Sequence, residues 1–181
     1  MNIRPAREED LPAMLEIYRP YVEETTASFE YVTPTLTEFR IRFLEHISQF
    51  PWLVWEEDSR VLGYAYAGLA YGREAYRWCA EISIYFRRDA RGHGRGRQIL
   101  TVLEEILTRQ GYRICYAIIT AENQASLRFH EAMGYRTVAE LPDCGYKMGR
   151  WLGIRYLQKD LNPLGKPEAF PRSWRELEEL P

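Results

Sequence analysis

The chain has 181 residues, of which 46% are hydrophobic and 28% are charged. This size and composition are typical of one compact domain with a substantial hydrophobic core. The formal net charge of -2 argues against the overall positive field of proteins that bind nucleic acid or anionic membranes. Any anion site must therefore be local.

The N-terminus has no basic start followed by an apolar run, and no segment approaches the roughly 20 apolar residues of a membrane span. Cys79, Cys115 and Cys144 are widely spaced and odd in number, which fits neither a disulfide framework nor a zinc-ligand pattern. We therefore expect reduced thiols, no metal, and a cytoplasmic protein with neither nucleic-acid nor membrane partners.

Hydrophobic periodicity in the first half of the chain predicts two helices and the start of a sheet. We expect a short strand at residues 3–6, followed by a helix with Asp10 as its N-cap and Pro12 in its first turn. Thr35 and Glu38 have the spacing of a capping box and predict the start of a second helix. Two β-rich runs at 52–55 and 61–66 predict an antiparallel hairpin.

The second half continues the alternation of strands and helices. In chain order we expect an extended segment at 77–86, a glycine-rich loop, a helix that ends at Gly111, a buried strand at 114–119, a short helix at 126–133, and strands at 135–138 and 154–157. The residues after Leu161 are rich in Pro and Glu. We therefore divide the chain into a domain at 1–161 and a peripheral tail at 162–181.

The glycine-rich loop reads Arg91-Gly92-His93-Gly94-Arg95-Gly96-Arg97 and precedes a predicted helix. Closely spaced glycines let backbone N–H groups converge, and a helix N-terminus adds partial positive charge, so the loop suits a diphosphate. A P-loop is excluded because Arg97-Gln98 replaces its Lys-Ser/Thr pair, and a dinucleotide fingerprint is disfavoured because the loop lies mid-chain. A glycine-rich surface turn would leave the three arginines unexplained.

The pattern Arg91-x-x-Gly94-x-Gly96, after a strand at 82–86, resembles the acetyl-CoA signature of the GNAT N-acetyltransferases. Three further segments, at 76–81, 123–135 and 145–151, resemble the phosphinothricin and methionine sulfoximine acetyltransferases of that superfamily. These motifs follow the family order from Ile3 to about Leu157.

This resemblance implies an α/β (α+β) fold with a mixed, bent central sheet that splays open where two strands part. Acetyl-CoA would be the co-substrate, with its pantetheine beside the backbone of one strand and its pyrophosphate on the glycine loop. The residues expected to bind it are Ile84, Phe86, Arg91, Gly92, His93, Gly94, Arg95, Gly96, Arg97, Asn123 and Ser126.

The resemblance also implies two catalytic residues. Glu81 matches the glutamate that removes a proton from the attacking amine. Many GNAT enzymes have a tyrosine acid seven positions after the motif asparagine, and here that position is His130; imidazolium could act as the acid, neutral imidazole could hydrogen-bond the sulfur or pantetheine, or the ring could cap local structure. Met148 stands where some phosphinothricin enzymes carry a histidine, and methionine transfers no protons.

The acceptor is expected to be a small amine with a carboxylate or phosphinate. Arg77 and Arg73 are candidates for clamping that anion, with Tyr76 in the same aromatic and basic cluster. Phe29 and Tyr31 are expected to form an apolar wall of the acceptor pocket. The resembling enzymes pair through their later strands and helices, which implies a homodimer.

Two other functions fit the same motifs. The cofactor machinery could acetylate a polyamine, a protein N-terminus or a lysine instead. A non-catalytic acyl-CoA sensor would keep the pyrophosphate loop without turnover, because a fold alone does not establish activity.

Overall fold

A computed structural model describes residues 2–177 of the chain. Met1 and residues 178–181, the last part of the predicted tail, lie outside the described residues. The described part forms one mixed sheet in the order β1-β2-β3-β4-β5-β7-β6. Its strands are β1 (Asn2–Pro5), β2 (Trp52–Glu57), β3 (Arg60–Leu69), β4 (Cys79–Phe86), β5 (Ile114–Thr120), β6 (Arg136–Lys147) and β7 (Arg150–Asp160).

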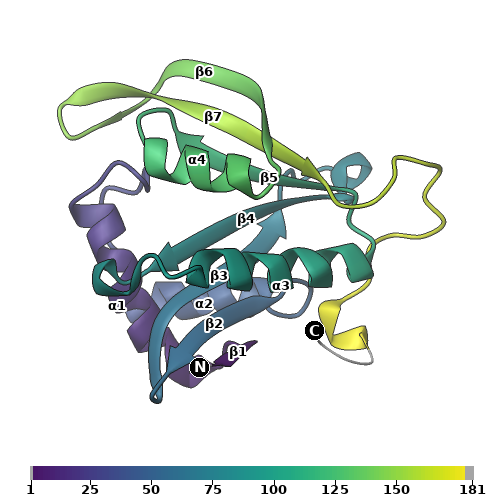
Figure 1. Cartoon of the computed structure of the whole chain (residues 1–181), viewed down its shortest axis with the longest axis horizontal. Helices are drawn as coiled ribbons and strands as arrows, with labels where there is room; N and C mark the ends of the chain where they lie inside the picture. The colour runs from purple at the N-terminus through teal and green to yellow at the C-terminus, as the bar shows by residue number, and fades with distance from the viewer. Residues whose placement is uncertain (1, 178–181) are drawn as a thin grey trace.

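Helices cover both faces of this sheet (Figure 1). The helices α3 (Arg95–Gln110) and α4 (Gln124–Ala132) lie on the near face, and α1 (Leu11–Glu23) and α2 (Leu36–His46) lie behind it. Apolar residues of α3 at helical spacing, such as Ile99, Leu103 and Ile106, are fully buried against the strands. The structure confirms the predicted mixed α/β class.

The local signals at the two first helices had different outcomes. The Thr35 hydroxyl accepts a hydrogen bond from the Glu38 amide at 3.2 Å, and the Glu38 carboxylate accepts one from the Thr35 amide at 2.7 Å, which confirms the capping box. Asp10 is the N-cap residue of α1, as predicted, but its side chain makes no capping hydrogen bond to that helix. Its carboxylate accepts from the Arg7 amide at 2.8 Å and pairs with Arg4 at 2.7 Å, because Asp10 ends a 3-10 turn that precedes α1.

Two predicted strands have different lengths in the structure. The segment expected to be extended from residue 77 begins as a strand only at Cys79, because a 3-10 turn at Glu74–Tyr76 precedes it. The strands β6 and β7 are 12 and 11 residues long, far beyond the predicted runs. Pro142 and Gly145 lie in β6, where the register shifts, and these residues obscure strand periodicity in the sequence.

The strands β4 and β5 pair over only part of their length. Their parallel register joins Cys79 to Ile114, Ala80 to Cys115 and Glu81 to Tyr116, and ends there. Beyond this point β4 continues beside β3 and β5 continues beside β7, so the two strands separate (Figure 1). The sheet therefore splays open immediately after Glu81.

The segment after β7 returns to the domain. The Trp174 indole is buried and donates to the Ile47 carbonyl at 2.8 Å. The Gln110 amide at the end of α3 donates to the Arg172 carbonyl at 2.8 Å. The described part of the tail thus contributes to the core, where a peripheral tail was expected.

Candidate active site

A cavity of about 700 Å³ occupies the place where β4 and β5 separate. Its wall includes residues 82–86 of β4 and 117–120 of β5, which face each other across the gap. The glycine-rich loop closes one end, α4 forms one side, and residues 25–27 of the loop after α1 complete the wall. The splayed sheet therefore opens into an elongated cleft whose edges are backbone groups and side chains of two strands.

The glycine-rich loop has the backbone that its sequence predicts. Gly92, His93 and Gly94 all have positive φ angles, of 87°, 55° and 76°. A left-handed backbone is tolerated by glycine without steric cost, and it turns successive N–H groups toward one side. Gly94 is the N-cap of α3, whose first turn contains no acidic residue. Amides of that first turn have no intrahelical partners, so the loop presents donors to an anion.

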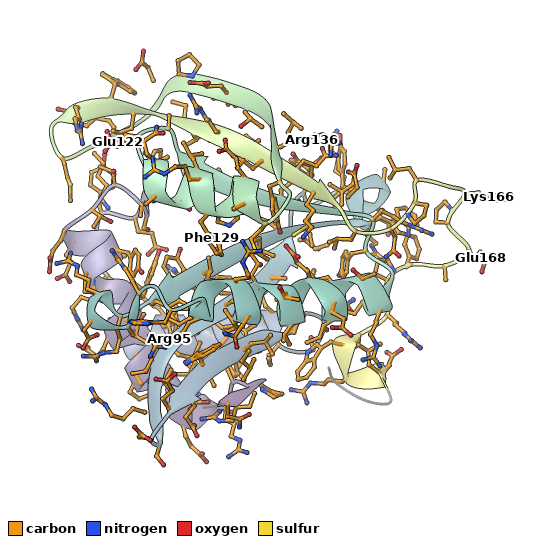
Figure 2. All side chains as sticks on the ribbon, in the orientation of Figure 1. Arg95, Glu122, Phe129, Arg136, Lys166 and Glu168 are labelled. Carbon is orange, nitrogen blue, oxygen red and sulfur yellow. The ribbon has the colours of Figure 1, made fainter. Side chains whose placement is uncertain are left out.

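The loop lines the cleft at every predicted position except His93, whose ring is exposed. The three arginines differ in their freedom to move. Arg95 is held by a two-point ion pair with Glu57 at the end of β2, at 2.9 and 3.1 Å, and Figure 2 shows it at the start of α3. Arg91 lies over the Tyr21 ring at 5.1 Å and Arg97 approaches the Ala132 carbonyl at 3.4 Å. Of the three arginines that were expected to serve an anion, Arg95 thus has its charge already paired with a carboxylate.

The edge of β4 faces the cleft with alternate backbone groups. The Tyr21 hydroxyl donates to the Phe86 carbonyl at 2.7 Å and accepts from the Phe86 amide at 3.0 Å. Because backbone groups of alternate strand residues point the same way, those of Ile84 also point away from β3 and into the gap. Of the two predicted pantetheine contacts, Ile84 thus presents its backbone to the cleft, while that of Phe86 is bonded to Tyr21.

The helix α4 and its N-cap contribute three predicted site residues, Asn123 and Ser126 at its start and His130 in its last turn. The Asn123 side-chain oxygen caps the helix by accepting from the Ser126 amide at 3.2 Å. The His130 Nδ1 lies 2.9 Å from the Ser126 carbonyl, which can only accept, so this nitrogen carries a proton. Burial lowers the pKa of His130, an effect that its bond to Ser126 partly opposes. The ring is therefore neutral at pH 7, and its Nε2 is an acceptor.

Glu81 lies at the apex of the cleft, at the last paired position of β4 and β5. Its side chain points to the face opposite that of its neighbour Ile82, because strand residues alternate. Ile82 lines the cavity, whereas Glu81 is not among its lining residues. Tyr85, which shares the strand face of Glu81, packs on Tyr18 and Tyr21 of α1. The Glu81 carboxyl therefore lies on the sheet face that packs against α1, at the position where β4 and β5 separate. Burial raises the pKa of the Glu81 carboxyl.

The predicted acceptor residues lie outside the large cavity. Phe29 packs against Gly145 of β6, so closely that a Cβ at Gly145 would overlap the Phe29 ring, and the Tyr31 hydroxyl donates to the Tyr146 carbonyl. Both residues therefore meet the tip of the β6–β7 hairpin.

The arginines predicted to clamp the acceptor anion also lie away from the large cavity. Arg77 is 3.3 Å from Glu74 and lies over the Phe170 ring at 4.8 Å, on the wall of a separate cavity of about 280 Å³. Arg73 and Tyr76 are exposed in and beside the 3-10 turn. The structure does not bring this segment to the cleft in the conformation described.

Sequence reasoning missed residues that contact the cleft through tertiary structure. Tyr21 and residues 25–27 line it, and Lys147 binds the loop that carries the latter. The only signal for Lys147 was its place in the Gly145–Trp151 motif. No local pattern marked Tyr21, whose partner is 65 positions away in the chain.

Comparison with known proteins decides the family. The model of the acetyltransferase (GNAT) domain matches residues 3–153. The chain belongs to the GNAT acetyltransferase family. The phosphinothricin N-acetyltransferase of Alcaligenes faecalis is 40% identical over 89% of this chain and 83% of that protein. The L-methionine sulfoximine/L-methionine sulfone acetyltransferase of Salmonella typhimurium is 34% identical over 93% of this chain and 99% of that protein.

A solved GNAT structure extends the comparison to the co-substrate. The phosphinothricin acetyltransferase of Sinorhizobium meliloti, crystallised with acetyl-CoA, has a TM-score of 0.86, is 32% identical, and covers 95% of this chain and 98% of that one. Acetyl-CoA is accordingly the co-substrate of this GNAT chain. The cleft fits it: a nest of amides lies at one end, and an unpaired strand edge runs toward Glu81.

Two further properties concern the described residues. None of the helices between residues 2 and 177 is both long and apolar enough to cross a bilayer. The same residues contain no group of three or more His, Cys, Asp or Glu side chains placed to hold a metal ion.

Proposed function

We propose that this GNAT enzyme transfers acetyl from acetyl-CoA to the amino group of a small amino-acid-like acceptor, of the phosphinothricin or methionine sulfoximine type. The transfer is direct, within a ternary complex. The observation that carries the proposal is the cleft itself, which has an anion-binding loop at one end and, where β4 and β5 separate, the half-buried Glu81 carboxyl beside it. The names of the relatives support the acceptor class.

In this proposal Glu81 is the base that removes a proton from the acceptor's ammonium group. An ammonium group is not nucleophilic, so it first loses a proton to the carboxylate. The neutral nitrogen then attacks the thioester carbonyl carbon, and the carbon–sulfur bond breaks. The nitrogen loses a second proton as the amide forms, and the departing CoA thiolate takes up one proton, so the transfer balances. Because burial raises the pKa of Glu81, this carboxylate is a stronger base than an exposed one.

The role of His130 follows from its protonation. A neutral ring whose Nδ1 proton is bound to Ser126 cannot act as an imidazolium acid. We propose instead that His130 is a hydrogen-bond acceptor: it lies on the cavity wall that faces the co-substrate, and its Nε2 accepts. Met148 lies in the hairpin turn with its side chain half exposed and a φ of 51°, so this enzyme works without a proton-transferring group there.

The acceptor pocket lies on the Glu81 side of the sheet in this proposal. Phe29 and Tyr31 extend the loop that forms the cleft wall, and we keep them as its apolar side. An acceptor carboxylate is not held by Arg77 while that guanidinium lies on Phe170. Arg73 and Tyr76, on the same segment, share this restriction.

We also infer a homodimer. The strand β6 is the edge of the sheet and is exposed along almost its whole length. Long, exposed edge strands with apolar side chains pair readily with other chains. The exposed apolar residues of this hairpin are Val138, Leu141, Tyr146, Met148 and Trp151. A second copy would cover them, and light scattering should give twice the monomer mass; a monomer at micromolar concentration would contradict this.

A cytoplasmic location remains part of the proposal and is supported by three free cysteines.

The test of the proposed function is acceptor-dependent release of CoA from acetyl-CoA. The acceptors are methionine sulfoximine, phosphinothricin, spermidine and a peptide with a free N-terminus. We expect turnover with the first two and little with the others. Turnover with spermidine or the peptide alone would move the enzyme to another acceptor class. Acetyl-CoA binding without turnover on any amine would favour the acyl-CoA sensor.

A further inference from the structure

A buried lysine joins the β6–β7 hairpin to the loop between α1 and α2, residues 24–35. Lys147 is the last residue of β6, and its side chain is 5% exposed. Its Nζ donates to the carbonyl oxygens of Val22 at 2.6 Å, Thr25 at 2.8 Å and Ser28 at 2.6 Å. An ammonium group has three donors and no acceptor, so these carbonyls satisfy it completely.

The position of the three carbonyls shows what this contact holds. Val22 lies in the last turn of α1, where carbonyls have no intrahelical partners and the helix dipole is negative. Thr25 and Ser28 lie in the α1–α2 loop. Burying a charge is costly without partners of this kind, and among residues 2–177 Lys147 forms no ion pair. Its three hydrogen bonds thus go to backbone carbonyls of the last turn of α1 and of the loop that follows, and the Glu30 carboxylate of that loop also attracts its charge.

This loop is part of the cleft. Residues 25–27 line the large cavity. Thr26 is bonded on the other side, because its carbonyl accepts from the Thr120 hydroxyl at 2.6 Å and its hydroxyl donates to Glu122 at 2.7 Å. The loop therefore lies between the end of β5 and the hairpin.

A tight turn between β6 and β7 places Lys147 against this loop. Lys147 pairs with Arg150 across a two-residue turn, in which Met148 and Gly149 have φ angles of 51° and 78°. Two positive φ angles are typical of the tight turns that match strand twist. Figure 1 shows this turn beside the loop that follows α1. Phe29 on Gly145 and Tyr31 on Tyr146 reinforce the same contact.

We propose that Lys147 is a positioning residue that fixes the α1–α2 loop as the acceptor-side wall of the cleft, a role that rests on the proposed function. Lys147 is not among the residues that line the large cavity, so it acts through the loop. Replacing Lys147 should leave the glycine-rich loop intact and loosen the α1–α2 loop. The acceptor should be affected more than the co-substrate.

The test compares Lys147→Met with Lys166→Met. Lys166 is exposed on the projecting loop of the tail (Figure 2), so it controls for loss of a lysine. In K147M the acceptor KM should rise about tenfold or more, because small misplacements of a binding wall cost up to about 100-fold, while the acetyl-CoA Kd changes less than about twofold. Amide hydrogen exchange in residues 24–35 should accelerate about tenfold. K166M should match the wild type in all three.

A second variant reaches the same loop without touching the lysine. In Gly145→Ala the new Cβ would overlap Phe29 and push the loop from the hairpin, so the same rise in acceptor KM and the same faster exchange are expected. If K147M fails to fold, the acceptor KM and the hydrogen exchange of G145A test the proposal by themselves. Wild-type exchange rates and acceptor KM in the folded variants would overturn the proposal. Absence of acetyl transfer by the wild type would overturn the proposed function instead, because hydrogen exchange tests the loop contact without any acceptor.

Discussion

Glu81 is the residue on which the mechanism depends. Glu81→Gln keeps the shape of the side chain and removes the base, so kcat/KM at pH 7 should fall about 100- to 10,000-fold. The loss should diminish at high pH, where the acceptor amine loses its proton unaided. Wild-type activity should fall as the pH drops through the raised pKa of Glu81. Initial rates from pH 5 to 10 measure both; an equal loss at every pH would contradict the base assignment.

The same substitution has an opposite effect on stability. A carboxyl whose folded-state pKa is raised stabilises the fold below its unfolded pKa, and this contribution is lost as the pH rises through the folded pKa. At pH 7 the ionised, half-buried Glu81 thus opposes folding. E81Q should be at least as stable as the wild type in urea unfolding at pH 7. A clearly less stable variant would show that Glu81 has favourable partners in the folded state.

The sequence predicted some site residues but not their long-range partners. The anion-binding role of the glycines was predicted from residue type and spacing, and that of Glu81 from the family resemblance. The pairing of Arg95 with Glu57 and of Tyr21 with Phe86 joins positions 38 and 65 apart. Such partners are set by the tertiary fold, so no local pattern could identify them.

The glycine-rich loop is the element that should control co-substrate binding. Gly94→Ala places a Cβ where no neighbour is closer than 3.7 Å, but at a φ of 76°. The left-handed conformation costs a non-glycine residue roughly 1–2 kcal/mol, so the acetyl-CoA Kd should rise roughly 5- to 30-fold by calorimetry. Gly72→Ala, also in open space but without a positive φ, is the control. Equal affinities in the two variants would show that the loop backbone does not select the ligand.

The splay of the sheet was implied by family resemblance, and local sequence alone does not predict it. It arises because β4 and β5 pair at three positions and then follow different neighbours, and strand pairing is non-local. The hairpin lengths were missed for a related reason. Pro142 and Gly145 interrupt the β pattern, yet pairing to β7 continues on both sides of them.

At the scale of the whole molecule, the tail packs against the segment after α2 and the end of α3. Trp174 is 8% exposed, whereas Phe170 is 53% exposed. Trp174→Ala should therefore cost about 3–5 kcal/mol of unfolding free energy, and Phe170→Ala should have an effect within about 1 kcal/mol. Urea unfolding of both variants measures the difference. Small, equal effects would restore the prediction of a peripheral tail, and the domain boundary at residue 161 stays a prediction.

The most direct test of the account is a two-substrate initial-rate study with acetyl-CoA and methionine sulfoximine. Direct attack at the apex of the cleft predicts CoA release only when the acceptor is present, intersecting lines in double-reciprocal plots, and N-acetylated acceptor as the product. Parallel lines with an acetylated enzyme would contradict direct transfer. No acceptor-dependent release with any amine would contradict the assignment of acetyl transfer itself.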